Sequence, residues 1–131
     1  MAESENSEQE LIIKFRMFEQ QIQLVQEQIQ AVEQGIMDLN NLNIGLDELI
    51  GKADSEILAP IGRGIYAKAK LMSETLLVDV GGGNFVKKTI PDTKKILDNQ
   101  IKKLEEIKKE LNSAMEKINE EITKTFVDNK K

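Results

Sequence analysis

The feature that most constrains the fold of this chain is a seam of apolar residues spaced alternately four and three apart, which occurs twice. A 3.5-residue period keeps one face of a helix turned toward a partner helix, which is the condition for a coiled coil. Eleven of the twelve positions in the first seam are apolar, in a chain whose overall apolar fraction is 40%. The first seam consists of Leu11, Phe15, Phe18, Ile22, Val25, Ile29, Val32, Ile36, Leu39, Asn43, Leu46 and Ile50.

The second seam lies in the last third of the chain. It consists of Ile90, Lys94, Leu97, Ile101, Leu104, Lys108, Leu111, Met115, Ile118, Ile122 and Thr125. Two such helices at the ends of one chain predict an antiparallel coiled-coil hairpin, in a fold that is α+β but mostly α. We expect a single domain over residues 1–131, with helices over 9–50 and 91–126 and polar tails over 1–8 and 128–131.

Residues 52–89 change to a period of two and predict four short strands in two successive hairpins. Two hairpins of this size bury little and leave their edges unpaired, so we expect strands from other chains to complete the sheet. The apolar residues expected in this oligomerisation platform are Ile57, Leu58, Ile61, Ile65, Leu76, Leu77, Val78, Val80 and Phe85.

Polar residues interrupt both seams. A polar residue at a seam position fixes the register of a coiled coil at some cost in stability, and we expect this of Asn43 and Lys108.

Apolar residues also lie off the seam, at the helix ends that meet at the tip farthest from the strands. This excess indicates either a dimerisation contact, a frayed end, or a surface that binds apolar partners. The candidate binding residues are Leu11, Ile12, Ile13, Phe15, Met17, Phe18, Ile122, Phe126 and Val127. At the other end of the first helix, Met37, Leu42, Ile44 and Leu49 are expected to pack against the β segment.

The composition argues against several classes of function. The net charge of −5 does not favour binding to nucleic acid or to an anionic membrane. The absence of Cys and His removes the usual zinc sites, thiol nucleophiles and His acid–base chemistry, so we expect no enzyme, no metal and no cofactor. Gly81–Gly83 lacks the Lys-Ser/Thr of a phosphate-binding loop and predicts a hairpin bend. No signal-peptide pattern is present, and we expect a cytoplasmic protein.

The β segment carries a family resemblance. It reads Glu56-Ile57-Leu58-Ala59-Pro60-Ile61-Gly62, then a Lys-rich strand with Tyr66, then Val78-Asp79-Val80-Gly81-Gly82-Gly83. This pattern, between two coiled-coil helices, resembles the alpha-class subunit of prefoldin, and the absence of Cys suits an archaeal source. The chain departs from the family pattern at Ala59 and at Lys87-Lys88, where a β-branched residue and acidic residues are common.

The resemblance implies an assembly of two alpha-class and four beta-class subunits, whose hairpins form a β-barrel platform from which coiled-coil arms extend. It implies an ATP-independent co-chaperone that captures unfolded proteins at the arm tips and delivers them to a group II chaperonin. The alternative is a structural or tethering coiled-coil protein that binds one specific folded partner. A helical arm that binds nucleic acid is a second alternative, which the acidic charge disfavours.

Overall fold

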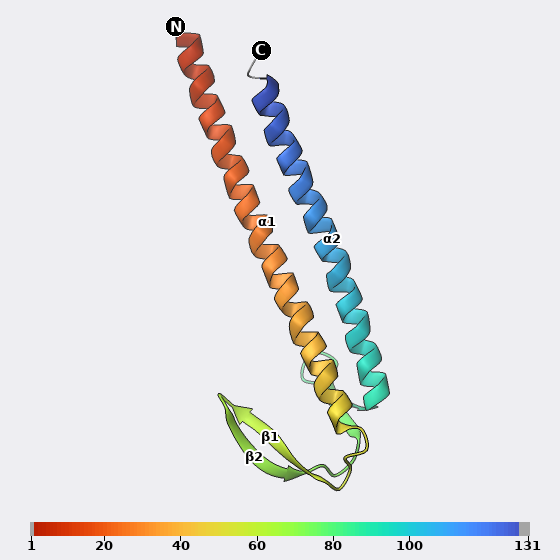
Figure 1. Ribbon diagram of the computed structural model, residues 1–131. Helices are drawn as coiled ribbons and strands as arrows, with labels where there is room; N and C mark the ends of the chain where they lie inside the picture. Colours follow the sequence, from red (N-terminus) through yellow and green to blue (C-terminus); the bar gives the residue numbers. More distant parts are fainter. Residues whose placement is uncertain (1, 129–131) are drawn as a thin grey trace. The chain divides into compact units, whose positions relative to one another are not determined.

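The computed structural model describes residues 2–128, and the side chains of residues 7–127. The elements follow in the order α1 (Ala2–Leu49), β1 (Glu56–Gly62), β2 (Ile65–Lys70), β3 (Thr75–Asp79), β4 (Phe85–Thr89) and α2 (Ile90–Asp128). The described chain forms two compact units, one within Met1–Ile36 and Lys103–Lys131 and the other within Met37–Lys102. Within each unit the two helices run antiparallel (Figure 1), as the two seams predict.

Helix α1 begins at Ala2 and not near Gln9, so the polar tail expected over residues 1–8 is wrong for residues 2–8. Four of residues 2–8 are Ala or Glu, which are good helix formers without any apolar partner, and a polar composition therefore did not mark the end of the helix. At its other end α1 stops at Leu49, and Gly51 follows in the left-handed conformation with a φ of 76°. The backbone N–H of Lys52 donates to the Leu49 carbonyl at 3.1 Å and closes the helix end.

Helix α2 begins at Ile90, directly after the last strand, and Thr89 serves as its N-cap. The Thr89 hydroxyl accepts a hydrogen bond from the backbone N–H of Asp92 at 3.2 Å, which satisfies a donor at the helix start. The helix continues to Asp128, two residues beyond the expected end. The remaining residues of the expected C-terminal tail, 129–131, lie outside the described part of the chain.

The seam is confirmed by burial. Every second-seam position, from Ile90 to Thr125, is at least half-buried, as are eleven of the twelve first-seam positions. The exception is Ile50, which is 52% exposed because α1 has already ended and Leu49 packs inward in its place. The seam is narrow, and few of its residues are fully enclosed.

The best-enclosed core lies in the unit that contains the strands. Leu46 of α1 packs there with Ile90 and Leu97 of α2, and Ile90 is only 1% exposed. Leu39, Leu49 and Leu76 pack around this cluster, so strand β3 is tied to the helices through Leu76. Of the four residues expected to pack against the β segment, Leu49 packs on this cluster together with Leu76 of β3. The expectation is wrong for Met37, Leu42 and Ile44, whose side chains are exposed.

Polar pairs cross between the helices beside the seam. The Asn43 amide donates from Nδ2 to Asp98 Oδ1 at 3.0 Å, but the Asn43 carbonyl oxygen is buried and has no hydrogen-bond partner among the described residues. In the other unit, Lys108 Nζ lies 3.3 Å from Glu33 Oε1. These contacts specify which residues face each other, while the orphaned oxygen of Asn43 costs stability.

The β segment forms two separate antiparallel hairpins, as expected. Strands β1 and β2 pair from Glu56↔Lys70 to Gly62↔Ile65, with a bulge between Pro60 and Gly62. Strands β3 and β4 pair from Thr75↔Thr89 to Asp79↔Phe85. Each sheet has only two strands, and the described residues of one chain form no closed barrel.

The turn of the second hairpin confirms the role predicted for the glycine triplet. Gly81, Gly82 and Gly83 have φ values of 126°, 61° and 78°, a region that strains other residues. The backbone N–H of Gly81 donates to Asp79 Oδ1 at 2.9 Å, and Val80 N–H donates to the Asn84 carbonyl. The triplet is therefore a hairpin bend.

Candidate functional site

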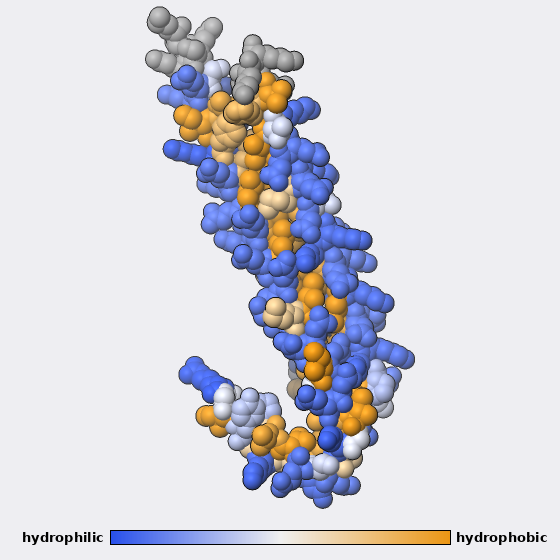
Figure 2. Space-filling view, in the orientation of Figure 1, coloured by the Kyte–Doolittle hydropathy of each residue, from blue (hydrophilic) through white to orange (hydrophobic). Residues whose placement is uncertain are grey.

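The apolar residues predicted at the helix ends gather on one unit, near the N-terminal end of α1 and the C-terminal end of α2. We call this set the tip surface. It comprises Leu11, Ile12, Ile13, Phe15, Met17, Phe18, Ile122, Phe126 and Val127. Figure 2 shows apolar side chains exposed on these terminal parts of both helices.

The tip surface has an inner and an outer row. The seam residues Leu11, Phe15, Phe18 and Ile122 are half-buried between the helices. The other five tip residues are 49–57% exposed, so two helices leave about half of each side chain in water. Half-exposed apolar side chains at one place on a surface are available to a further partner.

Two aromatic rings reinforce the inner row. The centroids of the Phe15 and Phe18 rings are 6.4 Å apart and the ring planes are inclined at 64°, which is an edge-to-face arrangement. Such pairs contribute roughly 0.5–1.5 kcal/mol beyond the area that they bury. The pair gives the tip surface a fixed apolar centre.

A shallow cavity of 270 Å³ opens beside this centre. Met17 and Phe18 line it from α1, and Thr125 lines it from α2. Charged side chains complete the rim: Lys14, Glu121 and Lys124. An apolar floor with a charged rim suits an amphipathic segment of polypeptide. Sequence reasoning missed this rim, because the three charged residues match an ordinary solvated helix face.

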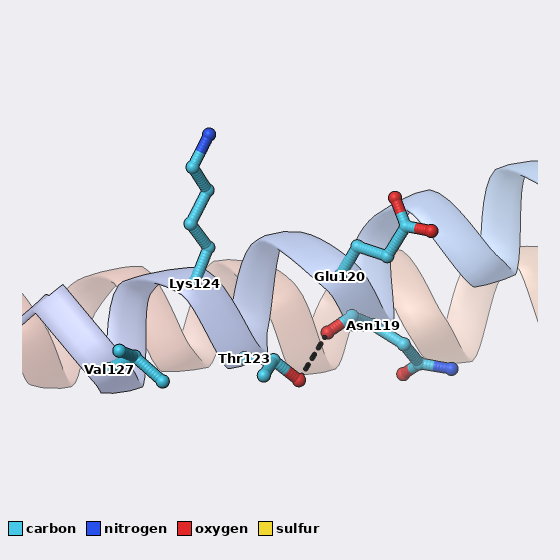
Figure 3. Close-up of a pocket in the computed structure, with 5 residues that line it drawn as sticks. All are labelled: Asn119, Glu120, Thr123, Lys124 and Val127. Carbon is cyan, nitrogen blue, oxygen red and sulfur yellow. Dashed lines mark hydrogen bonds between the residues drawn. The ribbon is translucent and has the colours of Figure 1, made fainter.

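A second depression, of 450 Å³, follows the outer face of α2 (Figure 3). Val127 supplies its apolar side, and the Thr123 hydroxyl donates to the Asn119 carbonyl at 3.0 Å. The Lys124 side chain extends away from the helix (Figure 3). The hydroxyl hydrogen of Thr123 is thus used in a bond within its own helix and is not available to a ligand.

Off-seam apolar residues also lie elsewhere on the helices. Leu24 and Ile107 are exposed, in addition to Met37, Leu42 and Ile44. Sequence reasoning did not single out Leu24 and Ile107. The signal that could have identified them was their apolar character at positions outside the seam. They are dispersed, whereas the tip residues lie close together.

The hairpins expose a second apolar surface. Ile57, Leu76 and Val78 are half-buried within the chain, but Ile65 and Val80 are 62% and 56% exposed. The remaining expected platform residues are also exposed: Leu58, Ile61, Leu77 and Phe85. Tyr66, which sequence reasoning did not include, is exposed beside them. A single chain does not enclose these residues, and their burial requires a partner.

A groove of 830 Å³ runs between the end of α1 and the first hairpin. Gly45, Glu48 and Leu49 line it from the helix, and Leu58 and Tyr66 line it from the strands. The groove extends the exposed apolar surface of the hairpin onto α1.

Within the part of the chain that the structure describes, no group of three or more His, Cys, Asp or Glu side chains is arranged to hold a metal ion. The described helices include none that is both long and apolar enough to cross a membrane.

Comparison with known proteins shows which family this chain matches. Residues 18–128 match the family model described as prefoldin subunit. The chain is 29% identical over 112 residues to prefoldin subunit alpha of Methanobrevibacter smithii. The matched region covers 85% of this chain and 77% of the relative. It is 27% identical over 119 residues to prefoldin subunit alpha 1 of Methanocaldococcus jannaschii, covering 82% of each protein.

A solved structure has the same fold. A chain from the cryo-EM structure of filamentous PFD from Methanocaldococcus jannaschii superposes with a TM-score of 0.78 at 20% sequence identity, covering 88% of this chain and 97% of that chain. The match confirms two long helices joined by two β-hairpins, the fold that the seams and the period change predict. With the family match over most of its length, the chain belongs to the prefoldin family.

Proposed function

We propose that this chain is a subunit of an ATP-independent chaperone assembly that captures unfolded proteins with its tip surface and delivers them to a group II chaperonin. The observation that carries the proposal is the half-exposed outer row, Ile12, Ile13, Met17, Phe126 and Val127, beside the Phe15–Phe18 pair. Unfolded proteins expose apolar side chains, and contact with these residues removes both surfaces from water.

The expected affinity of one tip is low. Full burial of an apolar side chain of this size contributes about 1.5–3 kcal/mol, and a side chain that is already half-buried contributes roughly half of that. Several such contacts per tip, repeated over the arms of an assembly, raise the overall affinity through effective concentration. Weak individual contacts still allow release. Met17 adds adaptability, because its unbranched side chain fits many partners.

The exposed hairpin residues support the second part of the proposal, assembly with other prefoldin subunits, including beta-class ones, through a shared β platform. Leu58, Leu77 and Phe85 are each more than 60% exposed. Unpaired strand edges next to exposed apolar side chains favour the addition of further strands. A barrel closed by several chains removes these edges.

The experiment compares two variants that carry four serine substitutions each and differ only in where these substitutions lie. The tip variant carries Ile12→Ser, Ile13→Ser, Met17→Ser and Val127→Ser. The control variant carries four substitutions at dispersed side chains of similar exposure: Leu24→Ser, Met37→Ser, Leu42→Ser and Ile44→Ser. Each variant is assembled with its partner subunits, and light scattering follows the aggregation of several unrelated denatured proteins.

We expect the tip variant to lose most of its protection of every client, while the control variant protects like the parent chain. Equal losses would assign client binding to the whole length of the arms. Protection of one protein only would support the alternative, a tether for a specific folded partner.

A further inference from the structure

The basic residues of α1 lie only near its N-terminal end, among the residues of the tip surface. Lys14 and Arg16 are the two basic residues of this helix, and residues 17–49 contain six acidic residues and no basic one. An anionic group that approaches α1 is therefore attracted at the tip surface and repelled along the rest of the helix.

A lysine from each helix borders the same cavity of the tip surface. Lys14 of α1 and Lys124 of α2 line the cavity of 270 Å³ that Met17 and Phe18 also line. Glu121 is the one carboxylate among the described residues that line it, so the rim has two positive charges and one negative charge. All three charged side chains are exposed. The rim of an apolar cavity thus carries a positive excess.

Neither rim lysine is neutralised by an ion pair within the part of the chain that the structure describes. A glutamate lies four residues before each lysine, Glu10 before Lys14 and Glu120 before Lys124, which is a spacing that favours ion pairs on a helix. Neither pair forms, and Figure 3 shows the ammonium group of Lys124 apart from the Glu120 carboxylate. Both positive charges are therefore available to an anion from outside the chain.

We propose that this cavity takes an apolar side chain of an unfolded protein together with the carboxylate of a nearby Asp or Glu, so that the tip surface prefers client segments that combine the two. The proposal rests on the client capture proposed above and names the class of segment that is captured. The apolar side chain covers Met17 and Phe18, and the carboxylate pairs with Lys14 and Lys124.

The combination of floor and rim argues against simpler ligands. A free anion would pair with the lysines but would leave the apolar floor in water, although Met17 is 53% exposed. An apolar side chain alone would cover the floor and bring no counterion to the lysines. In an extended chain, side chains two residues apart point to the same side and lie roughly 7 Å apart. A client segment with an acidic residue two positions from an apolar one therefore presents both groups together.

Glu121 should oppose this preference, because its carboxylate lies on the same rim and repels an acidic client residue. Removal of the Glu121 charge is expected to strengthen the preference, whereas removal of the lysine charges is expected to abolish it. The side chains are all exposed, so a merely structural role would not give effects of opposite sign.

The test compares three peptides that repeat Phe-Ser-Asp-Ser, Phe-Ser-Asn-Ser or Phe-Ser-Lys-Ser and differ only in the charged or neutral residue. Methyl NMR on the full chain, isotope-labelled at the methionine methyl groups, gives each dissociation constant from the shift of the Met17 signal. Met17 lines the cavity, and Met37, which is similarly exposed on α1 but does not line it, is the internal reference.

Two variants with the same net charge separate the rim from the charge of the whole chain. The rim variant carries Lys14→Gln and Lys124→Gln. The control variant carries Lys102→Gln and Lys109→Gln, at exposed positions of α2 that do not line the cavity. A third variant, Glu121→Gln, tests the opposing charge.

We expect the parent chain to bind the Asp peptide roughly fivefold more tightly than the Asn peptide at low salt, since exposed ion pairs each contribute modestly. The Lys peptide should bind more weakly than the Asn peptide. The rim variant should lose the preference for Asp, Glu121→Gln should increase it, and the control variant should keep it. Higher salt should reduce the preference, because salt screens exposed charges.

A Met17 signal that responds equally to the Asp and Asn peptides would overturn the proposal and leave client capture by apolar contact standing. Equal loss of the preference in the rim and control variants would also overturn it, because the net charge of the chain would then account for the preference. If no peptide shifts the Met17 signal, the tip surface does not bind apolar segments, and both this proposal and the proposed function fail.

Discussion

Replacement of Asn43 by leucine should stabilise the helix pair. Asn43 occupies a half-buried seam position, where its carbonyl oxygen has no partner among the described residues. Its amide donates to Asp98 at 3.0 Å, in an exposed setting. Leucine removes both polar groups and completes the apolar seam.

The magnitude follows from three contributions. Loss of the hydrogen bond to the exposed Asp98 costs about 1 kcal/mol. Removal of a buried carbonyl without a partner returns about 1–3 kcal/mol. Half-burial of a leucine side chain contributes roughly a further 1 kcal/mol. The net stabilisation is about 2 kcal/mol, which for a chain of this size raises the melting temperature by roughly 8 °C.

Circular dichroism at 222 nm would measure the melting temperature, with Asn41→Leu as the matched control, because Asn41 lies two residues away on an exposed face. The control should shift the melting temperature by little. Native mass spectrometry should show an altered distribution of oligomers for Asn43→Leu, since a polar seam residue restricts register. A lower melting temperature for Asn43→Leu would refute the reasoning and show that the Asp98 contact outweighs the orphaned oxygen.

Three further substitutions test local features of the fold. Gly45→Ala should stabilise the chain by about 0.5–1 kcal/mol in thermal unfolding, since the helix prefers alanine and, among the described residues, no atom outside the local helix backbone lies within 4 Å of the added Cβ; destabilisation would reveal a contact that the structure does not contain. Thr89→Ala should lower stability by about 1 kcal/mol through loss of the cap on Asp92, whereas Thr89→Ser should retain it, and equal losses would argue against a capping role. Val78→Asp lies on the same face of β3 as the packed Leu76 and should prevent assembly at a cost of several kcal/mol, so an intact oligomer in native mass spectrometry would contradict the platform assignment.

The sequence predicted the helices and hairpins because their signals are local. A 3.5-residue period is preserved by every seam position that α1 and α2 contain, and the turns within the two hairpins are marked by glycine. The start of α1 was missed, because residues 2–8 have a composition that suits both a solvated helix and a disordered tail. Ile50 was predicted to be the last residue of the helix, but α1 ends one residue earlier, at Leu49, and Gly51 follows in the left-handed conformation.

The features that the sequence did not predict depend on contacts between residues that are far apart in the chain. Met37 and Ile44 were expected to pack against the strands, but both side chains are exposed, and Leu49 is the helix residue that packs with Leu76 on the core cluster. The residues that face each other across the strands, such as Leu58 and Lys68, depend on strand register, and the bulge after Pro60 contributes to that register. The tip surface was predictable because it needed only helix periodicity and the antiparallel arrangement.

The central claim is that the tip surface holds unfolded proteins, and truncation tests it most directly. Removal of residues 1–18 together with 122–131 deletes the tip surface and leaves several heptads of seam, the polar pairs of Asn43 and Lys108, and both hairpins. The truncated chain, assembled with its partner subunits, would be assayed for suppression of aggregation of several unrelated denatured proteins. We predict that assembly persists and that protection is lost. Protection equal to that of the full-length assembly would contradict the account and place client binding elsewhere on the arms.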